Sequence, residues 1–201
     1  MTDVTLIYSF FGLVAGLLIG SVGIGGVILV PSLYFFAGAD IYQSIATAMF
    51  AFIISGALGS FIYSRNGLIV WSSSAYLILG ALPGAIFGAL LLVYINAIIL
   101  KVFIASLIIL SAIRELIGKK DEETINNRSD VPTKQSSLMV GIITGVLSAM
   151  SGTGGPLILI PILMWLGTSA SVAVGLSQVI QVPISVVASL GNYSNNLIER
   201  D

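Results

Sequence analysis

The chain contains no cysteine and no histidine, and only 8% of its 201 residues are charged. Without cysteine there is no disulfide and no thiolate, and without histidine the commonest metal ligand is missing. We therefore expect no redox enzyme, no metal site and no cofactor. The remaining hydroxyl groups have no base beside them in the sequence, so an enzyme is not expected. A net charge of −1 gives no electrostatic reason to bind nucleic acid.

The scarcity of charge decides the class of protein. A soluble domain normally carries roughly 25% charged residues. Here 57% of the residues are hydrophobic and the mean hydropathy is +1.07. We therefore predict an all-α, polytopic helical membrane protein. No Asp, Glu, Lys or Arg lies near the middle of an apolar block, so a carboxylate proton relay is not indicated. Lys101, near the start of its block, can snorkel outwards.

Six apolar blocks can supply membrane segments, since a helix that spans the hydrocarbon core needs about 20 apolar residues. Two blocks are too long for one upright helix and are interrupted by glycines, Val4–Gly38 and Ser137–Leu166. The other four have the length of one span: Ile41–Ser64, Leu68–Val93, Ala97–Ile117 and Ser171–Leu190. Polar or glycine residues separate the first four blocks, among them Asp40, Asn66 and Asn96.

The charged residues gather in one stretch. Between Arg114 and Lys134 lie ten of the seventeen, five basic and five acidic. The basic ones place this stretch in the cytoplasm by the positive-inside bias. We therefore expect a first membrane repeat at 1–118, a cytoplasmic linker at 119–136 and a second, truncated repeat at 137–201. The chain is expected to lie in the cell (cytoplasmic) membrane as a multi-pass protein.

The two halves of the chain are related. Residues 12–26 align with residues 141–155 at an offset of 129, and each copy contains a Gly-x-Gly-Gly break followed by a proline. After its break the first half continues for two spans more than the second half, so the second repeat is incomplete. If Val4–Gly38 crosses the membrane once, the two copies share an orientation. If it is a re-entrant pair of half-helices, the copies are inverted.

The two breaks are the main candidates for a binding site. Where a helix restarts, its first amide groups are unpaired and its dipole end is positive, which favours an anion. The predicted binding residues at the breaks are Gly23, Gly25, Gly26, Ser151, Gly152, Thr153, Gly154 and Gly155. The alternative is close helix packing through small residues. We expect packing to explain the glycines that recur every four residues elsewhere: Gly12, Gly16, Gly20, Gly80, Gly84 and Gly88.

Polar residues in the span after each break complete the predicted site. These are Thr47 in the first half and Ser177, Gln178 and Gln181 in the second. Gln178 and Gln181 are three residues apart and lie near one another on a helix face. Because an unpaired amide is costly in lipid, both should face the protein interior or a cavity. Hydrogen bonding between helices is the alternative role.

Several stretches together resemble the TauE/SafE family of membrane transporters. They are GIGGVILVP, SIATAMF, SRNGLIVW, GTGGPLILIP and AVGLSQV, in this order along the chain. The resemblance implies a small-anion transporter of the cytoplasmic membrane, built from two related halves, for sulfur-containing or organic acids such as sulfite. The chain departs from the family pattern in having one glycine fewer in its first break and in lacking the last two membrane segments.

Two functional hypotheses follow. In the first, the chain carries a small anionic solute across the lipid bilayer, and the two breaks meet near the bilayer midplane to hold it. In the second, it is a truncated, non-transporting membrane protein or subunit whose glycines only pack helices. A homodimer would restore the helix count of a complete protein.

Overall fold

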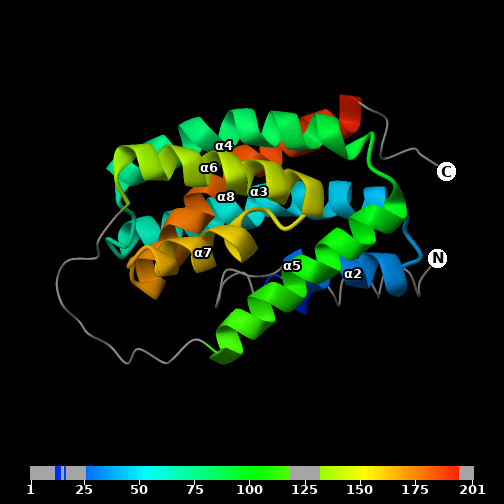
Figure 1. Ribbon diagram of the computed structural model, residues 1–201, viewed down its shortest axis with the longest axis horizontal. Coiled ribbons are helices and arrows are strands. Elements are labelled where there is room, and N and C mark those ends of the chain that lie inside the picture. Colours follow the sequence, from blue (N-terminus) through cyan, green and yellow to red (C-terminus); the bar gives the residue numbers. More distant parts are fainter. Residues whose placement is uncertain (1–11, 15, 17–25, 118–131, 195–201) are drawn as a thin grey trace.

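The computed structural model describes residues 12–14, 16, 26–117 and 132–194, and all regular structure in these ranges is helical (Figure 1). The predicted all-α class is therefore confirmed. The helices are α2 (Gly26–Phe35), α3 (Ile41–Arg65), α4 (Trp71–Leu92), α5 (Ala97–Ile117), α6 (Lys134–Ser151), α7 (Pro156–Trp165) and α8 (Ala170–Ser194). Among the described helices, α3, α4 and α8 are long and apolar enough to cross a membrane.

The polar residues between the predicted blocks act as helix caps. Asp40 precedes α3, and its carboxylate accepts a hydrogen bond from the Tyr42 amide at 3.2 Å. Asn66 ends the same helix, and Gly67 follows with φ 67°. Before α5, Asn96 Oδ1 accepts from the Ile98 amide at 3.0 Å. The side chains of Asp40 and Asn96 thus each satisfy a backbone amide that the start of a helix leaves open, whereas Asn66 ends α3 through its backbone amide.

Helices α4 and α6 lie side by side in parallel, with glycines at their contact (Figure 1). A Cβ added to Gly88 would lie 3.0 Å from Val146 Cα, and one added to Gly145 would lie 2.9 Å from Ala85 N. These neighbours are backbone atoms, so each glycine allows the opposite helix to approach closely. The packing role predicted for three glycines of α4 is confirmed: Gly80, Gly84 and Gly88.

The same role was expected of the N-terminal glycines, and the described part of the structure does not show it. No atom there lies within 4 Å of a Cβ added to Gly12 or Gly16. Gly20 lies outside the described residues. The physical difference is the partner: in the described structure the glycines of α6 face α4, whereas Gly12 and Gly16 face open space.

Helix α8 packs against both α3 and α4 and carries much of the core. A Cβ added to Gly56 of α3 would lie 3.2 Å from Gln181 Cγ of α8. At the other end of the contact, a Cβ added to Gly175 of α8 would lie 2.7 Å from the carbonyl oxygen of Leu68, just after α3. As residue numbers rise along α3, the residue numbers of the contacting positions in α8 decrease, so the two helices run antiparallel (Figure 1).

Each half also contains a short helix followed by a long one. Helices α2 and α7 have 10 residues each, with Pro31 and Pro161 inside them, and α3 and α8 have 25 residues each. The internal repeat stays a prediction. If the two copies of the repeat are inverted, the helices paired by the offset should have equal lengths and the two long ones should run in opposite directions. Helices α3 and α8 meet both requirements.

Candidate functional site

The second glycine break is a turn of left-handed backbone between α6 and α7. Gly152 ends α6 with φ 70°, Gly154 follows with φ 75°, and Gly155 caps α7 with φ 120°. L-residues with a Cβ rarely adopt such φ values, so the turn requires glycine. Pro156 then starts α7 at a position where no backbone hydrogen-bond donor is needed.

The turn reverses the chain, so that α6 and α7 form a hairpin (Figure 1). Helix α6 begins at the end of the molecule where α4 begins, since Gly80 contacts Leu138. Helix α7 ends four residues before α8, whose first turns lie at the same end beside Leu68. Ten helical residues rise about 15 Å, half of a hydrocarbon core about 30 Å thick. Helix α7 is therefore too short to cross the hydrocarbon core by itself.

Side chains and neighbouring helices enclose the break. Ser151 and Thr153 are buried, and their hydroxyl oxygens are 2.9 Å apart in a hydrogen bond. A Cβ on Gly154 would lie 2.7 Å from Phe52 Cδ2 of α3, and one on Gly152 would lie 3.0 Å from Val30 Cγ2 of α2. The missing side chains let α2 and α3 close over the turn.

Gln181 joins the break to α3. Its Nε2 donates to the Phe52 carbonyl at 3.2 Å and to Ser55 Oγ at 3.0 Å. Its Cγ would lie 3.3 Å from a Cβ on Gly154. The structure thus brings Gln181 and the break together. Sequence reasoning missed Phe52, although a signal exists: Phe52 precedes Gln181 by 129 residues, the offset of the repeat.

The other predicted polar residues lie elsewhere. Gln178 packs against α3, where a Cβ on Gly59 would lie 3.0 Å from its Cγ. Ser177 Oγ donates to the Val174 carbonyl at 2.7 Å, within its own helix. Thr47 is exposed on α3. At the first break Gly26 begins α2, and the two remaining predicted glycines lie outside the described residues, Gly23 and Gly25.

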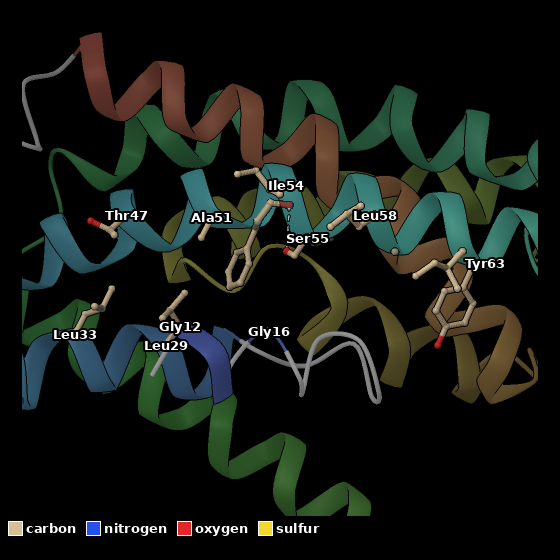
Figure 2. A pocket seen from close by; sticks show the side chains of 13 residues that line it. Gly12, Gly16, Leu29, Leu33, Thr47, Ala51, Ile54, Ser55, Leu58 and Tyr63 are labelled. Atoms are coloured by element: carbon tan, nitrogen blue, oxygen red, sulfur yellow. Dashed lines mark hydrogen bonds between the residues drawn. The ribbon is translucent and has the colours of Figure 1, made fainter. Parts of the chain in front are cut away.

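An open pocket of about 550 Å³ lies on the other side of Phe52, between α3 and α2 (Figure 2). Figure 2 shows side chains of α3 along one side and Leu29, Leu33 and the two N-terminal glycines on the other. The described residues that line it are Gly12, Gly16, Leu29, Leu33, Thr47, Ala51, Phe52, Ile54, Ser55, Leu58, Gly59, Ile62 and Tyr63. Because Phe52 and Ser55 also contact the break or Gln181, pocket and break share a wall.

A cationic side chain, Lys101 of α5, contacts α2. Its Nζ donates to Tyr34 OH at 2.6 Å and lies 4.3 Å from the centre of that ring. From its position in the sequence, Lys101 was expected to reach outwards. In the structure its ammonium group also links α5 to α2. Within the described ranges, no three His, Cys, Asp or Glu side chains gather where they could hold a metal ion.

Known proteins match almost the whole chain. A family model described as "Sulfite exporter TauE/SafE" matches residues 8–200. The chain belongs to the TauE/SafE family. It is 29% identical to "Probable membrane transporter protein YdhB" of Bacillus subtilis, over 98% of this chain and 80% of that protein. It is 27% identical to "Probable membrane transporter protein MJ0441" of Methanocaldococcus jannaschii, over 90% of this chain and 69% of that protein. No solved structure matches it.

Membership of the family and the apolar helices identify a multi-pass membrane protein of a transporter family. Such a protein works on a small solute within a lipid bilayer. The family and both relatives are named for transport and not for an enzymatic reaction.

Proposed function

We propose that this TauE/SafE protein carries a small anion across the cell membrane and holds it at the second glycine break. The observation that carries the proposal is the buried N-terminus of α7, beside the hydroxyls of Ser151 and Thr153. Half-helices that point their positive ends at an anionic substrate are a recurring device of transporters built from inverted repeats. Helix α2, with the same length, is the counterpart in the first repeat.

Backbone and hydroxyl groups select the class of solute. The first turn of α7 contains no acidic residue, and its cap, Gly155, has no side-chain hydrogen bond to the helix. No carboxylate therefore offsets the positive end of the dipole, which favours an anion there. A site made of amide and hydroxyl donors suits a compact oxyanion such as sulfite or a small organic acid.

In our proposal the arrangement of the described residues is the closed form of this site. The two hydroxyls bond one another, and Phe52 with Gln181 lies against Gly154. In our proposal a solute reaches the break from the pocket when α3 and α8 shift and Phe52 withdraws. The hydrogen bonds of Gln181 to α3 would hold the closed form between transport events.

Flux measurements on proteoliposomes test the proposal. Ser151→Ala and Thr153→Val remove the hydroxyls with little change in shape. A hydrogen bond to a charged group contributes about 1.5–3 kcal/mol, so each variant should raise the KM for radiolabelled sulfite at least about ten-fold. Ser74→Ala is the matched control, because Ser74 is also buried but bonds the Val70 carbonyl at the start of α4.

Unchanged KM values in both variants would refute the proposed site. If the unaltered chain moves none of a panel of sulfur-containing and organic anions, the alternative of a non-transporting subunit is favoured. The mass of the detergent-solubilised particle separately tests the predicted homodimer.

A further inference from the structure

The pocket lies where the repeat offset would place a counterpart of α4. On the other side of the molecule, α4 lies against α6 and α8. Its contacts include two places where it meets a glycine: Gly145 of α6 beside Ala85, and Gly191 of α8, whose added Cβ would lie 2.8 Å from Ala89 Cβ. Glycines on both neighbours thus make the seat of α4.

At the repeat offset, the residues that contact α4 correspond to residues that line the pocket. Counted back by 129 residues, Gly141 and Gly145 become Gly12 and Gly16, and Gly191 becomes Ile62. Gly12, Gly16 and Ile62 all line the pocket (Figure 2). The glycines of α6 are covered by α4, whereas no described atom lies within 4 Å of a Cβ on Gly12 or Gly16.

Exposed apolar side chains mark the same face of α3. Ile54, Leu58 and Ile62 line the pocket and are 61%, 60% and 55% exposed. Their neighbours in the pocket are the small residues Ala51, Ser55 and Gly59. An alternation of large and small residues accepts a helix that itself carries glycine and alanine.

We propose that this groove is the seat of a transmembrane helix of the α4 type, the one that follows α8 in a complete second repeat. The two relatives offer room for it, because the matched regions cover 80% and 69% of their lengths. Helix α4 of a second copy is a poorer occupant, since its own glycines already face α6. The proposal rests on the repeat and does not depend on transport.

Disulfide cross-linking tests whether a helix binds in this groove. Because the chain contains no cysteine, the only thiols are the ones that are introduced. The full chain carrying Ile62→Cys is mixed in lipid bicelles with a synthetic peptide of residues 71–92 carrying Ala89→Cys. This peptide stands in for the proposed helix, and the two cysteines reproduce the contact of Gly191 with Ala89. Because a seated helix holds the two thiols at high effective concentration, cross-linking should exceed that of a control by about ten-fold.

The matched control is Phe61→Cys, since Phe61 is 57% exposed but does not line the pocket. A second variant adds Gly16→Leu to Ile62→Cys. No described atom lies within 4 Å of a Cβ at this position, so the leucine should fill the groove and abolish the cross-link while circular dichroism stays unchanged. Equal cross-linking at Phe61, or none at Ile62, would overturn the proposal. Dimers of the chain linked through Ile62 in place of the peptide would show instead that two copies meet at this groove.

Discussion

Two glycines at equivalent positions of the repeat should respond oppositely to the same substitution. Gly145 lies on α6 against α4, and Gly16 is its counterpart at the offset of 129. We predict that Gly145→Ala destabilises the protein and that Gly16→Ala does not. The pair isolates the effect of a packed partner helix, because the residue types and the substitution are identical.

The magnitude follows from the neighbours of each added methyl group. At Gly145 it would lie 2.9 Å from Ala85 N and 3.0 Å from the Ala81 carbonyl carbon, so two backbones must separate. Overpacking of this kind costs about 1–3 kcal/mol, and the better helix propensity of alanine returns about 1 kcal/mol. At Gly16 only the second effect remains. The two variants should differ by about 2 kcal/mol in free energy of unfolding.

Equilibrium unfolding in mixed micelles of increasing SDS content, followed by circular dichroism, measures both values. The midpoint should fall for Gly145→Ala and should rise slightly for Gly16→Ala. If Gly145→Ala is as stable as Gly16→Ala, the two helices do not pack backbone against backbone. If Gly16→Ala is the less stable variant, the groove beside it is already filled.

Two further predictions concern the break. Gly154→Ala and Gly38→Ala both place a Cβ at positive φ, 75° and 71°, which costs about 1–2 kcal/mol, but only Gly154 also faces Phe52. Gly154→Ala should therefore lower both the unfolding midpoint and sulfite flux more than Gly38→Ala; equal losses in stability and flux would contradict the contact with α3. Gln181→Leu should lower the free energy of unfolding by about 1–2 kcal/mol, because it removes the hydrogen bonds to the Phe52 carbonyl and to Ser55 Oγ. Ser55→Ala should cost less and should add little to Gln181→Leu; full additivity in a double-mutant cycle would show that the two side chains do not interact.

The sequence predicted the helices well because their boundaries depend on local chemistry. Asp40, Asn66 and Asn96 separate the apolar blocks in the sequence and cap or flank helices in the structure. The break between two helices at residues 152–155 was likewise indicated by its glycines.

The contacts between helices could not be predicted in the same way. Gly16 and Gly145 occupy equivalent positions in nearly identical patterns, yet within the described residues only Gly145 meets another helix. Phe52 gives no polar signal, and its position under Gly154 depends on how α3 crosses α8. Thr47 and Gln181 looked alike as polar residues within apolar spans, and the fold exposes the first and buries the second. Such differences are properties of the assembled bundle.

The hairpin of α6 and α7 has a consequence for biosynthesis. Backbone groups at mid-depth are tolerated in a membrane only when protein or water satisfies them. Part of the cover over the turn is made after it: a Cβ on Gly155 would lie 3.6 Å from both Ile180 and Ile184 of α8. The hairpin therefore leaves the ribosome before its cover exists. Insertion of α8 is then the step that makes the second half stable in lipid, and a nascent chain stopped before α8 would be a target for membrane quality control.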